Sequence, residues 1–369
     1  MSEKRIGIDC RLAGVKHAGI GRYVASLVTE LLKQPVANLK YVLFFFDQAQ
    51  AEAVLGKDIA SPRLEIVLAP IKHYGLSEQW QLPRIYQAAK LDLLHVPHWN
   101  VPLFYRGQLV ITVHDLLWHQ QKGLHMTTLP AWQYALKYLI YLYVVKQAVK
   151  KAKSIFVPAA TIAETVAHYY PFAKNKIVVT KEGVAKEYRL NKEPKRVAKQ
   201  LVYTGSLYPH KNLSLVIRSL HKLSKYKLLI VGSRSVFQDQ VQNLIKRYKV
   251  KDQVQMLGYL DDQALCALYQ SSSALVQPSL SEGFGLTGLE AMAAGTPVLA
   301  SDIPIFKEIY QDAAIFFDPR STTSFCQAVK NLELNKRAEL IGRGQKVAAQ
   351  YQWSKMAQTT LSNYLTYVS

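Results

Sequence analysis

Short apolar runs alternate along this chain with longer stretches in which apolar residues recur at helical spacing. In the first half the apolar runs predict strands over residues 5–9, 41–46, 92–96, 109–113, 154–157 and 176–180. Helices are predicted from about residue 20 and over residues 78–89, 129–150 and 162–169. Strands that alternate with helices indicate a parallel sheet covered by helices on both faces.

The same alternation begins again after a polar stretch at residues 186–195, which is typical of an interdomain linker. Strand-like runs follow over residues 201–205, 227–232, 254–258, 274–277 and 297–300, each with a helical segment behind it. The second half is therefore also predicted to be doubly wound. Residues 354–367 are predicted to form a final helix.

The length of 369 residues exceeds what one hydrophobic core usually holds, so two domains are expected. Ligands of open parallel sheets bind beyond the carboxyl ends of the strands. Two facing sheets of this kind predict one cleft between the domains.

The most informative segment is a glycine-rich turn after a buried strand, with the sequence Ser281-Glu-Gly-Phe-Gly-Leu-Thr-Gly-Leu-Glu290. Gly283 and Gly285 permit backbone angles that other residues resist, so the turn can open directly into a helix. The first amides of that helix, near Phe284–Leu286, have no partners inside the helix and lie at the positive end of its dipole. They suit a diphosphate.

Two carboxylates, Glu282 and Glu290, bracket this turn. Glu282 lies just before the expected phosphate position, where it can accept hydrogen bonds from sugar hydroxyls, and Glu290 lies about a turn further along, on the helix. Two acceptors at this separation fit two polyol rings, a transferred sugar and a ribose. The segment predicts a nucleotide-sugar site; the alternative is an ordinary strand–loop–helix with two exposed glutamates.

The segment from Val276 to Val298 resembles the E-x7-E signature of retaining GT-B glycosyltransferases of family 4, the mannosyltransferase-like members of glycosyltransferase group 1. The resemblance implies the GT-B fold, an α/β architecture in which two doubly wound Rossmann-like domains face an interdomain cleft. Residues 1–188 would then form the acceptor side and residues 189–352 the nucleotide-sugar donor side. A helix over residues 353–369 would return to the N-terminal domain.

A second run, Thr204-Gly-Ser-Leu-Tyr-Pro-His-Lys-Asn212, ends a predicted strand and starts a helix. Asn212 is placed as the helix N-cap, and Lys211 beside it can neutralise a diphosphate leaving group. The run looks like the family's Gly-x-Leu…Arg-Lys-Asn motif, with Ser206 and His210 where an arginine is frequent. Lys211 is therefore the expected main cation, and a solvated lysine beside a capped helix is the alternative.

Two segments of the predicted N-terminal domain resemble further family motifs. Ala18-Gly-Ile-Gly-Arg-Tyr23 is similar to the Gly-Gly-Ile-Gly-Arg-Tyr loop, in which the position of Gly19 approaches the donor phosphate or the acceptor. His114 and Asp115 follow a predicted strand and resemble the His-Asp pair whose histidine contacts the donor sugar. By spacing alone, a core or capping role is the simpler interpretation of that pair.

His98, Trp99 and Asn100 combine hydrogen-bonding groups with one large ring, which suits sugar recognition by stacking and hydrogen bonds. We predict that these three residues bind the acceptor, and related mannosyltransferase-like members carry a similar His-x-Pro-His segment. The predicted catalytic residues are Glu282, His114 and Lys211. The predicted donor-binding residues are Gly19, Ser206, Gly258, Tyr259, Leu260, Gly283, Phe284, Gly285, Leu286 and Glu290.

Charge and cysteine usage narrow the function classes. The formal net charge of +20 is spread over both halves and favours an anionic partner. No zinc-finger, helix-turn-helix or RNA-recognition signature accompanies it, so an anionic membrane face is favoured over nucleic acid. The three cysteines, Cys10, Cys266 and Cys326, are scattered, which argues against a disulfide framework and favours a reducing, cytoplasmic setting.

No metal is expected, because the histidines and cysteines lack metal-ligand spacing and the pair Asp261-Asp262 is typical of a helix start. No apolar signal region is found near the N-terminus, and the longest lipophilic run, residues 138–145, is far shorter than the ~20 residues of a membrane span. We expect a cytoplasmic protein.

The predicted helix around residues 134–153 is compatible with a peripheral position at the inner face of the cytoplasmic membrane. It carries tyrosines at positions 134, 138, 141 and 143 together with several lysines, and both residue types suit a membrane interface. A core helix with a solvated edge has the same composition, so both interpretations stay open.

Together these features predict a retaining hexosyltransferase, with mannose favoured as the sugar. It would use a GDP- or UDP-sugar, need no cofactor, and act on a glycan or polyprenyl-linked acceptor in cell-envelope polysaccharide synthesis. Catalysis would lie mainly in stabilising leaving-group charge. Two alternatives stay open: a nucleotide-sugar epimerase of the same fold, which needs no second substrate, and a non-catalytic basic scaffold that binds polyanions or membranes.

Overall fold

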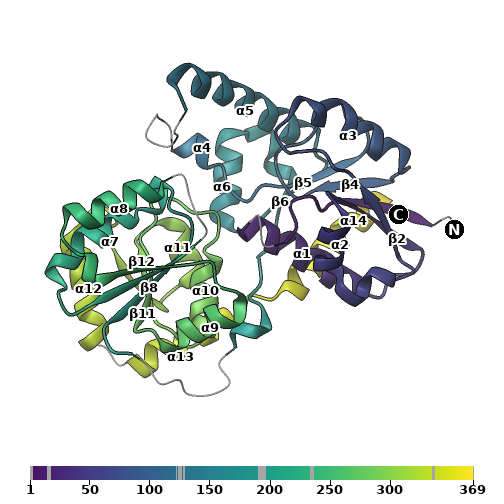
Figure 1. Ribbon diagram of the computed structural model, residues 1–369. Helices are drawn as coiled ribbons and strands as arrows, with labels where there is room; N and C mark the ends of the chain where they lie inside the picture. The colour runs from purple at the N-terminus through teal and green to yellow at the C-terminus, as the bar shows by residue number, and fades with distance from the viewer. Residues whose placement is uncertain are drawn as a thin grey trace. The chain divides into compact units, whose positions relative to one another are not determined.

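The computed structural model describes residues 3–14, 18–121, 123, 127, 129–189, 197–232, 237–334 and 337–368. The chain divides into two compact units (Figure 1). The first unit contains residues 1–116, 132–183 and 353–369, and the second contains residues 117–131 and 184–352. Each unit is built around its own parallel sheet.

The first sheet has seven strands in the order β3-β2-β1-β4-β5-β6-β7. Their bounds are β1 (Lys4–Asp9), β2 (Leu39–Phe45), β3 (Leu64–Leu68), β4 (Leu93–Val96), β5 (Leu109–Thr112), β6 (Ile155–Val157) and β7 (Ile177–Val179). All neighbours pair in parallel. Every residue of β4, β5 and β6 is buried, as expected for strands covered on both faces. The strand order reverses between β1 and β4.

Helices cover both faces of this sheet. Their bounds are α1 (Ala18–Leu32), α2 (Gln48–Leu55), α3 (Leu76–Ala88), α5 (Ala131–Lys151), α6 (Ala160–Tyr169) and α14 (Trp353–Val368). Figure 1 shows α3 and α5 on one side of the sheet and α1 and α2 on the other. The sheet is therefore doubly wound.

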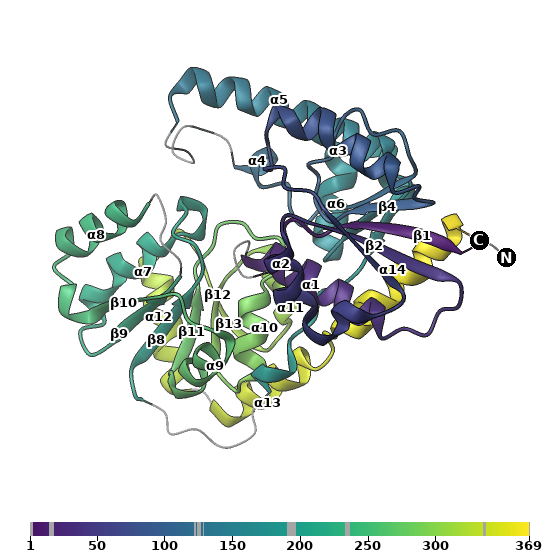
Figure 2. The same cartoon turned by 45° about the vertical axis from the view of Figure 1, so that its right-hand side comes forward.

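Helix α14 belongs to the first unit although it follows the whole second unit along the chain. Its buried residues repeat at helical spacing and include Trp353, Met356, Leu361 and Tyr364. The helix runs alongside α1 (Figure 2). The Tyr364 hydroxyl lies 2.5 Å from Nδ1 of His95, so α14 is tied to strand β4 by a buried hydrogen bond.

The second sheet has six strands in the order β10-β9-β8-β11-β12-β13. Their bounds are β8 (Gln200–Thr204), β9 (Lys227–Val231), β10 (Val254–Gly258), β11 (Ala274–Gln277), β12 (Val298–Ser301) and β13 (Ala314–Phe317). All neighbours are parallel. The strand order reverses between β8 and β11, which pair directly with each other.

The helices of the second unit are α4 (Leu117–Gln120), α7 (Leu213–Ser219), α8 (Gln238–Arg247), α9 (Asp262–Ser271), α10 (Leu286–Ala293), α11 (Pro304–Tyr310), α12 (Thr322–Leu334) and α13 (Arg337–Ala348). Figure 1 shows α7, α8 and α12 on one side of the sheet and α9, α10 and α13 on the other. The core under α7 and α12 contains Leu215, Ile217, Leu228, Val276 and Phe325.

Short 3-10 helices complete the two units. They are η2 (Gly56–Ala60), η4 (Pro171–Lys176), η5 (Lys186–Tyr188), η6 (Pro209–Lys211), η7 (Leu220–Lys222) and η8 (Lys251–Gln253).

The predicted fold class, two doubly wound α/β domains, is confirmed by these sheets. Two strands were missed, β3 and β13, and both lie at a sheet edge. Most of the predicted linker, residues 190–195, lies outside the described residues. Within the part of the chain that the structure describes, no helix is both long enough and apolar enough to cross a bilayer.

Candidate functional site

The two loops at the strand-order reversal of the second sheet meet through one ion pair. Lys211 ends η6 after strand β8, and Glu282 follows strand β11. The Lys211 ammonium lies 2.7 Å from Oε2 and 2.8 Å from Oε1 of Glu282. The side chains are 23% and 14% exposed, respectively, so solvent and a ligand can still reach them. The predicted cation and the predicted sugar-binding carboxylate thus occupy the position where open α/β sheets bind ligands.

Glu282 is held as an ionised carboxylate. Burial alone would raise its pKa, but the Lys211 charge and the hydrogen bonds from Lys211 and Ser279 outweigh burial and leave the pKa below its usual value. The Ser279 hydroxyl donates to Oε1 of Glu282 over 2.7 Å. An ionised, anchored carboxylate is a hydrogen-bond acceptor at neutral pH. Sequence reasoning missed Ser279, whose position three residues before Glu282 was the available signal.

His210 does not add a second positive charge to this loop. Burial and, secondly, the neighbouring Lys211 charge lower its pKa to about 4, and Glu282 opposes them only in part. The ring is therefore neutral at pH 7. Lys211 is the cation of the His210–Asn212 segment.

Asn212 occupies the N-cap position of α7 but does not cap it with its side chain. Its backbone is left-handed, with φ at 54°. The side-chain amide instead donates to the carbonyls of Pro278 and Pro319 over 2.9 and 2.8 Å. The predicted capping role was wrong, because two buried carbonyls of neighbouring loops compete for this side chain. Asn212 therefore joins the loops that follow β8, β11 and β13.

The other predicted cap, Asp261, is confirmed. Its Oδ1 accepts from the amide of Ala264 over 2.8 Å at the start of α9.

The glycine turn before α10 is required by close packing. Gly285 has φ at 103°, and a Cβ there would lie 2.4 Å from the Tyr310 hydroxyl. A Cβ on Gly288 would lie 2.3 Å from the same hydroxyl. The Tyr310 hydroxyl donates to the Gly285 carbonyl over 2.6 Å and so fixes the turn. No side chain caps α10, which leaves the amides near Leu286 available to an anion.

The remaining predicted donor residues are spread around these loops. Glu290 lies on α10 and is 2% exposed. The pKa of the Cys266 thiol on α9 is raised mainly by the burial of Cys266 and secondly by the charge of Glu290. Ser206 lies in the loop after β8, where its carbonyl accepts from the Tyr203 hydroxyl over 2.5 Å.

The segment after β10 carries the predicted base contacts. Gly258 has φ at 74° and its carbonyl accepts from the amide of Gly232 over 2.9 Å. Tyr259 beside it is 63% exposed, and Leu260 is half-buried. The backbone here is thus held in place while the tyrosine ring remains accessible.

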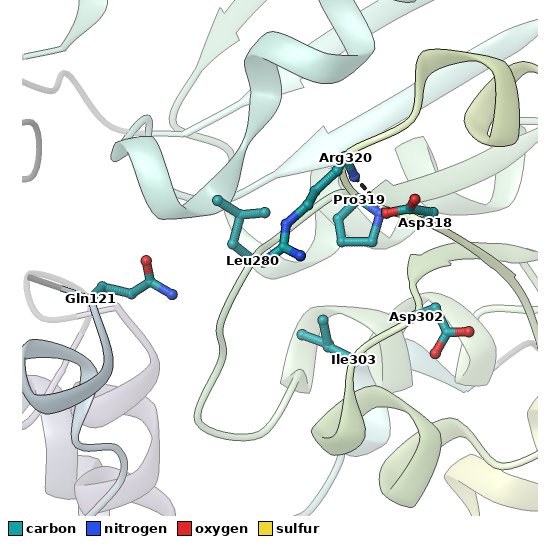
Figure 3. A pocket seen from close by; sticks show the side chains of 7 residues that line it. All are labelled: Gln121, Leu280, Asp302, Ile303, Asp318, Pro319 and Arg320. Carbon is teal, nitrogen blue, oxygen red and sulfur yellow. Dashed lines mark hydrogen bonds between the residues drawn. The ribbon is translucent and has the colours of Figure 1, made fainter.

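A cavity of about 250 Å³ lies beside the Glu282 loop (Figure 3). Its lining residues are Gln121, Leu280, Asp302, Ile303, Asp318, Pro319 and Arg320. Sequence reasoning selected none of these residues. The cavity borders the predicted site through Leu280, and through Pro319, which accepts the hydrogen bond from Asn212.

The first unit contains a buried charge cluster at its own strand-order reversal. Arg11, just after β1, lies 2.8 Å from Asp9 and 2.8 Å from Glu78, and these three side chains are 0%, 4% and 0% exposed. The Arg11 guanidinium also donates to the Ile71 carbonyl over 2.9 Å. Burial alone would raise the pKa of Asp9, but Arg11 lowers it to about 2. Both carboxylates therefore share one guanidinium, and Nδ1 of His73 also lies 3.3 Å from Oε1 of Glu78.

This cluster holds the predicted acceptor residues. The Asn100 side chain donates to Oε2 of Glu78 over 2.8 Å, and the Asn100 amide donates to Nδ1 of His98 over 3.0 Å. Burial lowers the pKa of His98 to about 3, so the ring is neutral. Because Nδ1 accepts a hydrogen bond, the ring proton lies on Nε2.

Aromatic rings surround His98. The ring of Trp99 lies 4.4 Å from that of His98, and Tyr74, which is 66% exposed, lies 6.1 Å from Trp99. The Tyr74 amide donates to Glu78 over 2.9 Å, so the charge cluster also positions this ring. Sequence reasoning found His98, Trp99 and Asn100 but missed Asp9, Arg11 and Glu78. Of these three, only Asp9 gave a signal, as a polar residue ending a buried strand.

His114 lies after β5 and is held from two sides. Its Nδ1 lies 3.2 Å from Oε1 of Glu182, and its Nε2 lies 3.3 Å from the Pro97 carbonyl. The ring of Tyr23 packs edge-on at 4.7 Å. The two contacts and the packed ring of Tyr23 together fix the orientation of the imidazole. Glu182, the residue that orients His114, was missed.

The glycines at the start of α1 have different constraints. Gly19 lies in the first turn, and no atom would be within 4 Å of a Cβ there. A Cβ on Gly21 would lie 1.9 Å from the Gly14 carbonyl. Steric contact therefore requires glycine at position 21, whereas Gly19 leaves an open space at the helix start.

The structure brings Lys211 and Glu282 together in the second unit, and His98 and Asn100 in the first. Among the described residues no group of three or more His, Cys, Asp or Glu side chains could hold a metal ion. The described residues of the second unit's site offer hydrogen bonding, the Lys211 ammonium and the amides of a helix start.

Two protein families match successive parts of the chain. Residues 17–188 match Glycosyltransferase Family 4, and residues 185–347 match Glycosyl transferases group 1. Together the two matches extend over both units.

Individual proteins agree with these families. The O-antigen chain mannosyltransferase RfbU of Salmonella typhimurium is 29% identical over 294 residues, which are 79% of this chain and 78% of that protein. Sucrose-phosphate synthase from Thermosynechococcus elongatus has a similar structure, with a TM-score of 0.76 and 18% identity over 98% of both chains. Anabaena HepE in complex with UDP and glucose has a TM-score of 0.76 and 16% identity, covering 98% of this chain and 100% of that one.

Proposed function

Since the chain belongs to family 4 of the group 1 glycosyltransferases and has the GT-B fold, we propose that it transfers a hexose from a nucleoside diphosphate sugar to a glycan or lipid-linked acceptor. The anomeric configuration is retained. Mannose is the favoured sugar, and GDP-mannose the favoured donor, because the similar Salmonella protein is named a mannosyltransferase. That name also favours cell-envelope polysaccharide synthesis as the setting.

The observation that carries the proposal is the contact between Lys211 and Glu282 at the reversal of strand order in the second sheet. Within the pair, Glu282 shortly precedes the uncapped start of α10 along the chain. On donor binding, Lys211 exchanges Glu282 for the diphosphate, and Glu282 exchanges Lys211 for sugar hydroxyls. The helix amides near Leu286 share the charge of the diphosphate.

Catalysis in this scheme lies in stabilising the leaving group. The bond between the anomeric carbon and the phosphate oxygen breaks, and the acceptor hydroxyl oxygen bonds to the same face of the sugar. The hydroxyl proton goes to the departing phosphate. Glu282 acts as an acceptor of hydrogen bonds and not as a nucleophile, because Ser279 donates to one of its oxygens and the sugar hydroxyls replace Lys211 on the carboxylate.

Three further assignments belong to the proposal. Glu290 binds the ribose of the donor, and the backbone from Gly258 to Leu260 contacts the base. In the first unit, His114 contacts the donor sugar in the orientation set by Glu182. His98, Trp99 and Asn100 bind the acceptor, with the Nε2 proton of His98 available as a donor.

The test is a panel of GDP-, UDP-, ADP- and dTDP-sugars, each followed by thermal shift and by donor turnover. We expect one nucleotide to raise the melting temperature by several degrees, and Glu290→Ala to abolish that shift. Glu187→Ala, at an exposed glutamate of the same unit, is the matched control. Turnover with a polyprenyl-linked sugar acceptor, followed by NMR of the product anomer, tests transfer and retention.

Other outcomes of these assays would indicate a different function. Conversion of the donor to its epimer without acceptor would indicate an epimerase. A thermal shift with a nucleotide sugar, but no turnover of any donor in the panel, would indicate a binding protein. Neither shift nor turnover with any nucleotide sugar would refute the proposal.

A further inference from the structure

Helix α5 exposes a continuous apolar stripe to solvent. Trp132, Leu136, Leu139, Ile140 and Tyr143 are 68%, 54%, 64%, 54% and 56% exposed. Their spacing places all five on one face of the helix. A run of large apolar side chains on an outer face marks an interaction surface. We call these five residues the α5 stripe.

The opposite face of α5 is firmly packed, so the exposure does not reflect a detached helix. Tyr141, Val144, Val145, Ala148 and Val149 are buried. The ring of Tyr141 packs edge-on against Trp99 at 4.8 Å. For Tyr141 the core interpretation therefore holds, and the face available to a partner is the one defined by the α5 stripe.

Positive charge continues the stripe. Lys146 and Lys150 lie three and seven residues beyond Tyr143, on the same face, and both are exposed. Helix α5 contains no acidic residue over its 21 positions. Near its end, the Lys176 ammonium donates to the Lys150 carbonyl over 2.9 Å, which brings another cation to this end of the helix.

A second apolar group lies beside this surface. Trp80 of α3 and Phe104 stack at 4.2 Å and are 58% and 47% exposed. The Lys151 ammonium donates to the carbonyl of Leu103 and so ties this loop to the end of α5. Figure 1 and Figure 2 both show α3 next to α5.

We propose that the α5 stripe, with Lys146 and Lys150, docks the enzyme on a bilayer that contains anionic lipids. Apolar side chains and the Trp and Tyr rings enter the boundary between headgroups and acyl chains, and the lysines meet lipid phosphates. A second copy of this chain would offer no acidic residue on α5 to pair with the lysines, whereas anionic headgroups complement them. The inference deepens the proposed function, in which a lipid-linked acceptor gives the bilayer a role.

Co-sedimentation with vesicles tests the docking surface without any acceptor. The wild type is compared on phosphatidylethanolamine vesicles with phosphatidylglycerol and on pure phosphatidylcholine vesicles. We expect binding to the anionic vesicles and at least about tenfold weaker binding to the neutral ones. Two variants remove the two parts of the surface, and each should weaken binding to anionic vesicles about tenfold or more. The serine variant combines Leu136→Ser, Leu139→Ser and Ile140→Ser, and the lysine variant combines Lys146→Gln and Lys150→Gln.

Matched controls remove the same chemistry elsewhere. Val197→Ser with Leu365→Ser removes two exposed apolar side chains, and Lys246→Gln with Arg247→Gln removes two exposed cations of α8. Both controls should bind vesicles as the wild type does. Thermal melting and donor hydrolysis in solution should be unchanged in all four variants, because none of these residues belongs to the proposed site.

Several results would overturn the docking surface. The first is equal loss of binding in test and control variants. The second is loss in the lysine variant only, which would indicate a purely electrostatic polyanion surface. The third is a concentration-dependent dimer that the serine variant abolishes, with no vesicle binding by the wild type. Each leaves donor turnover intact, so failure of this inference is distinguishable from failure of the proposed function.

Discussion

Replacing Arg11 with methionine removes the guanidinium that two buried carboxylates share. The side chains of Arg11, Asp9 and Glu78 are at most 4% exposed. Methionine keeps most of the volume but removes the guanidinium from both carboxylates, and Glu78 keeps only the contact with His73 among its basic partners. Breaking a buried ion pair by removing one partner costs about 3–5 kcal/mol. For a unit of this size, each kcal/mol lowers the melting temperature by about 2–4 °C, so we expect the first unit to melt about 6–20 °C lower.

The loss of stability caused by Arg11→Met should depend on pH in a defined direction. In the wild type, Asp9 has its pKa lowered to about 2, so its contribution to stability is present above about pH 4 and is lost as the pH falls from there toward 2. In Arg11→Met, the main group that opposes burial is gone, so the pKa of Asp9 rises. The variant's deficit should therefore be largest near pH 8 and should shrink toward pH 5, where the carboxylate can take up a proton.

Calorimetry of the full chain at several pH values is the assay, because it records the transitions of both units. Arg5→Met is the matched control, since Arg5 pairs with Glu65 in the same unit with the side chains 24% and 37% exposed. A partly exposed pair of this kind contributes about 0–1 kcal/mol. Adding Glu78→Gln to Arg11→Met should recover part of the loss. A deficit no larger than the control's, or one independent of pH, would refute the reasoning.

Two further changes probe the second unit. Lys211→Met should lower donor turnover about 100-fold, because it removes the ammonium that meets the leaving group; Lys225→Met, at an exposed lysine, should leave turnover unchanged in the same assay. Gly288→Ala should destabilise by about 1–3 kcal/mol in urea titrations, since its Cβ would lie 2.3 Å from the Tyr310 hydroxyl. At Gly342 no atom lies within 4 Å of an added Cβ, so Gly342→Ala should instead stabilise the protein by up to about 1 kcal/mol. Equal effects at the two glycines would contradict the packing argument.

The sequence predicted the interior of both sheets because buried parallel strands read as short apolar runs between helices. The edge strands were harder to find. In β3 the apolar run continues through Ala69 into Pro70, and β13 follows α11 with only a few residues between, so neither run has a clear boundary. Edge strands are also less buried, and none of the residues of β3 is fully enclosed.

The candidate site was predictable where one motif lies on one loop, and much less so where partners come from distant segments. Lys211 and Glu282 were each found within their own motif, but their ion pair joins positions 71 residues apart. Glu182 is 68 residues from His114, and Glu78 is 67 residues from Arg11. Such pairings depend on the order of the strands in the sheet, and the spacing of apolar residues along the chain does not predict that order. Asn212 shows the same limit, because its capping preference was overridden by carbonyls of distant loops.

The attachment of α14 to the first unit has a consequence for biosynthesis. The hydrogen bond between His95 and Tyr364 joins residues 269 positions apart, and all of the second unit's main segment is translated between them. At about 5–20 residues per second, a ribosome needs tens of seconds or less to cover that distance. Throughout that interval the nascent first unit lacks the helix that covers α1, while the second unit can already fold as it emerges. The half of the enzyme that is translated first is thus the half that is completed last.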